Sequence, residues 1–414
     1  MKNLVYYLLL ILIGFLSAEE PWATGQSKAE DLRIKLVTFG PGKDIPSWWG
    51  HGGIIVEDLG NRRARIYNFG LYSFDKGMLA KFAMGRLIFA VGDFSVPGYL
   101  YYYKQLDRDV RIQTLDILPE KRLQMAQLLA MNVLPQNREY LYHHYYDNCS
   151  TRLRDVINAA VDGALYRATD KPSRMTLRDE TRRYSGHCFP MELLLMYLMG
   201  PEIDQPIKEW DEMFLPDELE KYVGELMIPD ENGTLHPLVS DTYIFYKSDW
   251  NQVYDDVPVH WPLAVLSGLV IGLLAIAIVY WLRTSSGSWK RVIYGIYITI
   301  IGLILGIPGL GLALLSSFTD HSVTYYNENL IFVNPLTFIF IIAGVAIARN
   351  KSWGWIWQDR LWIIHCILLI VTLCLKILPS FDQDNALIFA FVIPIFLLNV
   401  IAVKLIPKSV KNSI

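Results

Sequence analysis

Residues 146–157, Tyr-Asp-Asn-Cys-Ser-Thr-Arg-Leu-Arg-Asp-Val-Ile, are the stretch on which the fold of the first half of the chain depends. Apolar side chains recur there at the spacing of a helix, at Leu153, Val156, Ile157 and Ala160. Asp147 or Asn148 is a natural N-cap, which puts Cys149 at the N-terminus of that helix. The positive end of the helix dipole favours a thiolate there, and the thiolate is the nucleophilic form of cysteine. A small buried structural cysteine is the alternative interpretation, and the neighbouring motifs decide between the two.

Composition divides the chain into two parts. The 414 residues carry a net charge of −3, which gives no reason to expect a nucleic-acid partner. Apolar residues make up 52% of the chain and are unevenly distributed. Residues 21–260 have the composition of a soluble domain, whereas residues 261–414 are mostly apolar enough for a lipid bilayer. The cysteines show neither metal-ligand spacing nor a disulfide framework; they lie at positions 149, 188, 366 and 374.

A signal-peptide pattern opens the chain. A positive charge at Lys2 is followed by an apolar run over residues 4–16 and by the small pair Ser17-Ala18. Residues 1–18 are therefore predicted to be a signal peptide cleaved after Ala18. Because Leu16 is not small, an uncleaved N-terminal membrane anchor is the alternative. In both cases the domain that follows, residues 21–260, is expected to be exported.

Five apolar segments, each long enough to cross a bilayer about 30 Å thick, follow the soluble part. They cover residues 261–282, 292–315, 330–348, 361–378 and 386–403. The first and third loops between them and the C-terminus carry Lys and Arg, whereas the second and fourth loops carry Asp and Glu but no Lys or Arg. This alternation predicts a membrane domain of five transmembrane helices over residues 261–407, with the C-terminus in the cytoplasm and the soluble domain on the exoplasmic side.

A second motif places a histidine at the start of a strand. Residues 48–57 read Trp-Trp-Gly-His-Gly-Gly-Ile-Ile-Val-Glu, with His51 between glycines, and residues 65–70 have the pattern of a returning strand. The dipeptide Gly60-Asn61 between them predicts a tight antiparallel hairpin.

The register of this hairpin brings a polar side chain to the histidine. If Leu59 pairs with Arg62, His51 lies opposite Gly70, and Asn68 lies on the same face one diagonal step away. A slip of one residue would put Tyr67 in that place.

These residues are sufficient for thiol chemistry. A cysteine nucleophile needs a base to take its proton and a third polar group to hold that base in the right tautomer. Cys149, His51 and Asn68 are the candidates for these three roles. For His51 taken alone, a hydrogen-bonded strand-end histidine is the alternative; His143 and His144 are the alternative bases.

The order of these parts and the motifs around them resemble known families. Histidine precedes cysteine, as in the circularly permuted papain-like fold of lecithin:retinol acyltransferase and its relatives. The motifs themselves resemble more closely those of the Lnb N-terminal periplasmic domain family. They are residues 49–53 (WGHGG), 66–70 (IYNFG), 146–155 (YDNCSTRLRD) and 204–216, followed by residues 321–336 with His321, Asn327 and Asn329.

The resemblance implies an α+β exported domain of permuted papain-like type followed by an all-α membrane domain in the bacterial inner membrane. It implies a lipoprotein N-acyltransferase, which moves a fatty acyl group from the diacylglyceryl moiety of a lipoprotein to the α-amine of its N-terminal cysteine. Cys149 would carry the acyl group as a thioester, with His51 as base and then acid. Its partners would be the membrane and a diacylated lipoprotein. No metal or other cofactor is expected, because the ester is already activated for group transfer.

Five further residues are expected to contact the substrate. Three of them are polar residues of the loop 316–335, which is predicted to lie on the same side of the membrane as the soluble domain. The other two lie close to Cys149 in the sequence. An ordinary solvated connection is the alternative for the loop. The candidates are Asn148, Arg152, His321, Asn327 and Asn329.

Two other functions remain open at this point. An exported cell-wall cysteine peptidase or amidase would use the same residues but does not need five membrane spans. A non-enzymatic membrane assembly factor would keep the fold and not the chemistry. The tyrosines Tyr99, Tyr101, Tyr102 and Tyr103 are interpreted as an interfacial aromatic belt or as buried strand packing.

Overall fold

The computed structural model describes residues 20–72, 77–230, 232–250, 252–283 and 288–406. The predicted signal peptide or anchor, residues 1–18, lies outside these ranges. The chain divides into two compact units: Met1–Glu180 with Pro206–Val253, and Thr181–Gln205 with Tyr254–Ile414. Residues 181–205, which the sequence places in the exported domain, thus belong by their contacts to the second unit.

The first unit is built on a seven-stranded antiparallel sheet with the strand order β6-β4-β3-β2-β1-β5-β9. The strands are β1 (Leu32–Phe39), β2 (His51–Asp58), β3 (Arg63–Tyr72), β4 (Ile88–Ser95), β5 (Val110–Leu115), β6 (Glu139–Leu141) and β9 (Val239–Tyr246). A separate antiparallel pair consists of β7 (Met227–Pro229) and β8 (Leu235–Pro237). The register of β2 and β3 confirms the predicted hairpin, since Ile54 pairs with Tyr67 and Asp58 with Arg63.

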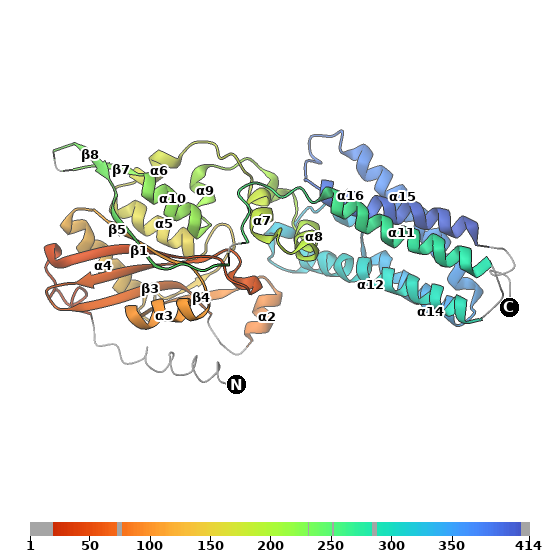
Figure 1. Ribbon diagram of the computed structural model, residues 1–414, viewed down its shortest axis with the longest axis horizontal. Helices are drawn as coiled ribbons and strands as arrows, with labels where there is room; N and C mark the ends of the chain where they lie inside the picture. Colours follow the sequence, from red (N-terminus) through yellow and green to blue (C-terminus); the bar gives the residue numbers. More distant parts are fainter. Residues whose placement is uncertain (1–19, 73–76, 231, 251, 284–287, 407–414) are drawn as a thin grey trace. The chain divides into compact units, whose positions relative to one another are not determined.

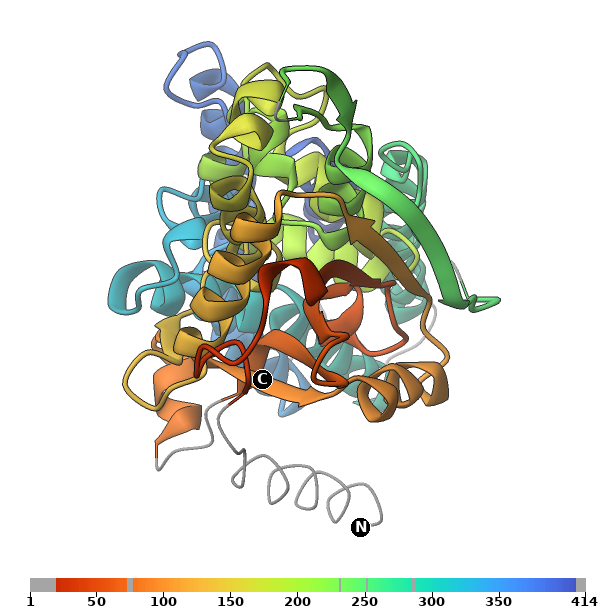
Figure 2. The same cartoon turned by 90° about the vertical axis from the view of Figure 1, so that its left-hand side faces the viewer.

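Helices cover both faces of this sheet (Figure 1). Apolar residues at alternating strand positions supply each face: Ile34, Leu36 and Ile54 belong to the core under α4 and α5, whereas Phe39 and Ile66 belong to the core under α3. Figure 2 shows α3 and α4 on opposite sides of the strands. The helices are α2 (Met78–Ala83), α3 (Val96–Gln105), α4 (Pro119–Asn132), α5 (Cys149–Ala160), α6 (Ala164–Thr169), α7 (Leu177–Ser185), α9 (Glu209–Glu212) and α10 (Pro216–Glu225).

The second unit contains five helical segments long and apolar enough to cross a membrane. They are α11 (Trp261–Arg283), α12 (Ser288–Phe318), the segment Asn329–Ala348, α15 (Ser352–Leu375) and α16 (Ala386–Leu405). The third of these is made of α13 (Asn329–Phe332), a 3-10 turn (Pro335–Phe338) and α14 (Ile339–Ala348). The five predicted spans are confirmed as helices, and the chain is a multi-pass membrane protein.

Small residues let these helices approach closely. A Cβ added to Gly295 of α12 would lie 2.5 Å from the carbonyl oxygen of Gly344 in α14, so the two backbones are in direct contact there. Lipid gives no hydrophobic driving force between helices, and close backbone packing of this kind is what stabilises their association.

One short apolar helix joins this bundle from the middle of the sequence. Helix α8 (Phe189–Leu198) contributes Met196 and Tyr197 to the same hydrophobic cluster as the membrane helices. Its sequence, FPMELLLMYL, is apolar on nearly every side, which suits an element surrounded by other apolar helices or by lipid.

Candidate active site

Cys149 is the first residue of α5, as the sequence predicts. Asn148 is the N-cap: its Oδ1 accepts hydrogen bonds from the N–H groups of Ser150 (2.8 Å) and Thr151 (2.9 Å). The Thr151 hydroxyl in turn accepts from the N–H of Asn148, which completes a capping box. The Asn148 amide donates to the carbonyl oxygens of His144 (2.6 Å) and Phe214 (2.9 Å). The backbone before and after Cys149 is therefore held by hydrogen bonds of the Asn148 side chain.

His51 and Asn68 are brought together by the β2–β3 register. The distance between His51 Nε2 and Asn68 Oδ1 is 2.7 Å. The N–H of Gly70 donates to the same Asn68 oxygen at 2.7 Å. Since a backbone N–H is always a donor, this atom of Asn68 is the carbonyl oxygen and accepts from His51 as well. His51 therefore carries its proton on Nε2, and Nδ1 is left free to take a proton, the tautomer that a general base needs.

Helix α5 packs directly on the start of β2. Gly52, the residue after His51, donates its N–H to the Cys149 sulfur. A Cβ added to Gly52 would lie 2.7 Å from Cδ1 of Leu153, one turn further along α5. Glycine allows this approach without displacing the Leu153 side chain, which accounts for the glycine that follows the histidine. Gly70 serves the same purpose on the other strand, because a Cβ there would lie 2.5 Å from Cε1 of His51.

Helix α3 supplies a second layer of side chains behind His51. The Asn68 amide donates to the Tyr99 hydroxyl at 2.5 Å. The rings of Phe39 and Tyr103 stack at 3.7 Å between centroids, and the His51 ring lies nearly parallel to both, 6.0 Å from Phe39 and 6.1 Å from Tyr103. The tyrosine run is thus helical, and its interpretation as strand packing is wrong: Tyr99 and Tyr103 are one helical turn apart and face the site.

Arg108 places a buried positive charge near the same residues. Its guanidinium donates to the carbonyl oxygens of Gly40 (2.7 Å) and Phe39 (3.3 Å) and lies 4.8 Å from the centre of the Tyr103 ring. No motif in the sequence identifies this arginine. The i, i+4 spacing of Tyr99 and Tyr103 is the sequence feature that could have indicated two tyrosines on one face of a helix.

Burial dominates the protonation of both reactive groups. It raises the pKa of the Cys149 thiol to about 11, although N–H groups of Gly52 and Ser150 and the Arg108 charge act in the other direction. Burial, and after it the Arg108 charge, lowers the pKa of His51 to about 4. The expectation that the helix terminus favours the thiolate is therefore wrong in its net direction, because desolvation outweighs the dipole. At neutral pH the pair consists of a thiol and a neutral imidazole.

The two alternative bases lie in the loop before α5. Burial, and after it His143, lowers the pKa of His144 to about 4. The His144 ring packs edge-on against Trp49, with 4.8 Å between centroids. His143 Nδ1 accepts from the N–H groups of Tyr145 and Tyr146, both at 3.3 Å. That nitrogen is occupied by main-chain donors; the assignment of His51 as the base stays a prediction.

Arg152 lies beside the nucleophile on α5. It forms a two-bond ion pair with Asp147, at 2.5 and 2.7 Å, and its guanidinium lies 4.4 Å from the centre of the Tyr140 ring. Together with Asp147 and Phe69 it lines a surface pocket of about 400 Å³. The predicted contact of Arg152 with substrate stays a prediction, as does that of Asn148.

The other predicted substrate residues belong to the second unit. The amide groups of Asn327 and Asn329 each donate to the carbonyl oxygen of Tyr197, both at 3.0 Å. His321 Nδ1 is 2.8 Å from the Thr319 hydroxyl. Asn327 and Asn329 are thus engaged with α8 and His321 with its own loop, and their contact with substrate stays a prediction. All four cysteines of the chain are free thiols, and the described ranges contain no group of three His, Cys, Asp or Glu side chains suited to a metal ion.

The fold and the site define a class: a membrane protein with an antiparallel α+β unit, in which the cysteine at the start of α5 accepts a hydrogen bond from the residue after a histidine that is paired with asparagine, and with a second unit of five membrane helices. Two family models match the chain, the Lnb N-terminal periplasmic domain over residues 18–182 and the Lnb transmembrane domain over residues 261–409. The chain belongs to the Lnb family. No match was found among curated proteins or among solved structures, so the detailed likeness to permuted papain-like enzymes stays a prediction.

Proposed function

We propose that this protein is a lipoprotein N-acyltransferase whose acyl carrier is Cys149. The observation that supports the proposal is that the N–H of Gly52 donates to the Cys149 sulfur while its neighbour His51 is hydrogen-bonded to Asn68. We assign Cys149, His51 and Asn68 the roles of nucleophile, base and orienting group. Its place in an Lnb-family membrane protein supports a lipid substrate over a peptide.

The first half-reaction transfers the acyl group to sulfur. Cys149 Sγ attacks the carbonyl carbon of a fatty ester in the diacylglyceryl group while His51 Nδ1 accepts the thiol proton. The N–H groups of Ser150 and Thr151 are engaged by the Asn148 cap, so stabilisation of the oxyanion falls to the N–H of Cys149 and to the helix dipole. The carbon–oxygen bond of the ester then breaks, and His51 returns the proton to the departing hydroxyl. The products are an acyl thioester on Cys149 and a lyso-glyceryl group.

The second half-reaction transfers the acyl group to nitrogen. The neutral α-amine of the lipoprotein's N-terminal cysteine attacks the thioester carbon, and His51 accepts a proton from the amine. The carbon–sulfur bond breaks and His51 reprotonates the sulfur, which regenerates the starting thiol. No external energy source is needed, because an ester is exchanged for a more stable amide through a thioester of comparable reactivity.

A neutral resting pair suits this sequence. With the pKa of Cys149 raised to about 11 and that of His51 lowered to about 4, the thiol loses its proton only as it attacks, so general-base catalysis by His51 is essential. The Asn68 hydrogen bond holds His51 in the tautomer that accepts a proton on Nδ1.

The distribution of charge in the membrane unit supports an orientation for this chemistry. Lys and Arg residues flank the cytoplasmic ends predicted by the positive-inside rule, which leaves the first unit on the exoplasmic side, at the leaflet where the acyl chains of exported lipoproteins lie. Attachment to that leaflet raises the effective concentration of ester and amine at Cys149.

The test is mass spectrometry of lipoprotein N-termini from cells that lack other N-acylating enzymes and express the wild type or a variant. Cys149→Ala is expected to abolish the N-acylated lyso form while the protein still inserts in the membrane. Cys188→Ala, which removes a half-buried thiol of the second unit, is the matched control and is expected to retain activity. N-acylated lipoprotein at the wild-type level with Cys149→Ala would refute the proposal, and release of free fatty acid without N-acylation would point to a hydrolase.

A further inference from the structure

The C-terminus of α8 is capped by side chains from the membrane unit. A helix leaves its last carbonyl oxygens without backbone partners, and inside an apolar environment each one left unpaired is costly. At α8 these oxygens belong to Met196, Tyr197 and the adjoining Met199. Asn327 and Asn329 donate to Tyr197, both at 3.0 Å, and Gln383 donates to Met199 at 2.9 Å.

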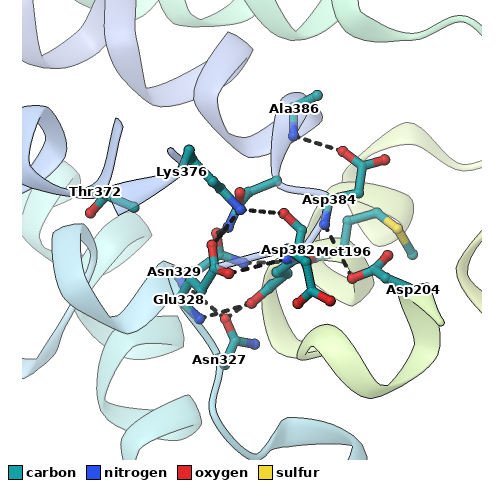
Figure 3. Close-up of polar contacts among 12 residues, drawn as sticks. Met196, Asp204, Asn327, Glu328, Asn329, Thr372, Lys376, Asp382, Asp384 and Ala386 are labelled. Carbon is teal, nitrogen blue, oxygen red and sulfur yellow. Dashed lines mark hydrogen bonds and ion pairs between the residues drawn. The ribbon is translucent and has the colours of Figure 1, made fainter. Parts of the chain in front are cut away.

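An ion pair between a buried carboxylate and a half-buried lysine holds these capping amides in place (Figure 3). Glu328, which is only 5% exposed, forms an ion pair with Lys376. Its carboxylate also accepts from the N–H of Gln383 at 3.1 Å, and its own N–H donates to Gln383 Oε1 at 2.8 Å. Lys376 donates to the Gln383 carbonyl oxygen at 2.5 Å. The capping network is Asn327, Glu328, Asn329, Lys376, Gln383 and Asn385.

The N-terminal half of α8 is fixed by a second buried carboxylate. Glu192 is completely buried, and its two oxygens contact Arg182 Nε at 2.9 Å and His260 Nδ1 at 2.6 Å. His260 directly precedes the first residue of α11, and Arg182 also donates to the carbonyl oxygen of Pro258 at 2.8 Å. Helix α8 is therefore held at both ends, by the entry to the first membrane helix and by the capping network.

These contacts are specific to one position of α8. Apolar packing alone would let a short Leu- and Met-rich helix slide or rotate, because its sides are chemically alike. Buried charges and amides tolerate no such movement, since any shift leaves a charge or a hydrogen-bonding group unpaired. The structure thus fixes α8 more tightly than membrane anchoring of a short helix requires.

The chain connects this segment to the first unit on both sides. Residues 181–205, here called the docking segment, belong to the membrane unit, whereas the residues before 181 and residues 206–253 belong to the first unit. Helix α7 contains the first of these boundaries, and Gln205, at the second, donates to Asp382 of the membrane unit at 2.9 Å. A third connection follows Val253. A protein that needed only a tether would have one connection.

We propose that the docking segment is the element through which the membrane unit positions the catalytic unit for reaction with lipid-embedded substrate, and that the Glu328–Lys376 pair locks it. This inference rests on the proposed acyl transfer only for the identity of the substrate. Asn327 and Asn329 are, on this view, positioning residues that act through α8. The Glu328–Lys376 pair is expected to affect the rate of reaction with an ester held in a membrane and not the intrinsic reactivity of Cys149.

The experiment compares Lys376→Met with the double variant Glu328→Gln/Lys376→Met. The single variant leaves a buried carboxylate without its cation, whereas the double variant removes both charges and keeps the shape of the network. Lys121→Met, which breaks an exposed ion pair with Asp162 in the first unit, is the control. Three properties are measured: chymotrypsin cleavage after Tyr184 and Tyr197 in spheroplasts, N-acylation of lipoprotein, and turnover of the water-soluble ester p-nitrophenyl butyrate.

Lys376→Met is expected to speed cleavage within the docking segment and to lower lipoprotein N-acylation, each by tenfold or more, with turnover of the soluble ester within twofold of the wild type. The double variant is expected to recover most of both losses. Unchanged cleavage with Lys376→Met, or an equal loss of soluble-ester turnover, would overturn the proposal. If the wild type turns over the soluble ester but does not N-acylate lipoprotein, the proposed function fails, and the cleavage assay still decides on the docking segment.

Discussion

The protonation state of Cys149 leads to a quantitative prediction about its reactivity without substrate. Burial raises the pKa of this thiol from about 9 to about 11, and each pH unit below the pKa reduces the thiolate fraction tenfold. At pH 7.5 the thiolate is therefore about 100-fold scarcer than for an ordinary cysteine. Because iodoacetamide reacts with the thiolate only, alkylation of Cys149 is expected to be slower by about that factor and to accelerate about tenfold per pH unit between pH 7 and 10.

The assay is alkylation of the purified full-length protein in detergent, stopped at intervals, with the modified Cys149 peptide quantified by mass spectrometry. Alkylation after unfolding in urea supplies the rate of the same cysteine without burial. Restricted access of the reagent lowers the rate by a constant factor, so the slope against pH is the decisive quantity. A rate that is fast at pH 7 and reaches a plateau below pH 8 would show a thiolate–imidazolium pair and would refute a neutral resting state.

Three further substitutions test the construction of the site. Gly52→Ala puts a methyl group 2.7 Å from Leu153 and is expected to lower the free energy of unfolding by about 1–3 kcal/mol. The control is Gly98→Ala, whose methyl group meets no atom within 4 Å and is expected to be tolerated. Equal effects of the two variants in thermal denaturation would contradict the packing argument. Asn148→Ala removes the N-cap of α5 and is expected to cost about 1–2 kcal/mol in the same measurement; an unchanged melting temperature would show that the cap does not stabilise the helix. Tyr99→Phe removes the hydroxyl that accepts from Asn68 and is expected to lower kcat about tenfold with little change in KM. Tyr101→Phe, at an exposed position, serves as the control. A change in KM alone would speak against a positioning role.

Local rules were enough to predict the two motifs and their pairing. The register of β2 and β3 followed from one turn and from strand alternation, because a two-residue period leaves few alternatives once the turn is placed. The start of α5 at Cys149 followed from the capping preference of Asn148. The five membrane helices followed from length and hydropathy, since a bilayer imposes both.

Tertiary packing decided what the sequence did not predict. The sign of the pKa shift at Cys149 depends on how many atoms surround the sulfur, and the helix dipole is only one small contribution to it. Tyr99 and Arg108 reach the site from α3 and from the turn before β5, far from either motif in sequence. Helix α8 has the composition of a core helix in either unit; only the partners of Glu192 and of its terminal carbonyl oxygens assign it to the membrane unit.

The protonated state of Cys149 has a consequence for its resistance to oxidation on the exoplasmic side, where we propose that the first unit lies. The thiolate form of cysteine attacks hydrogen peroxide and disulfides. Repeated oxidation by peroxide ends in sulfinic and sulfonic acids, which thiols cannot reduce. A catalytic cysteine with a permanently ionised sulfur would need constant repair in an oxidising compartment. For the acyltransferase that we propose, burial that keeps the proton on Cys149 until an ester arrives would make the resting protein resistant to oxidation. The same desolvation that demands a base during catalysis would then also protect the nucleophile between turnovers.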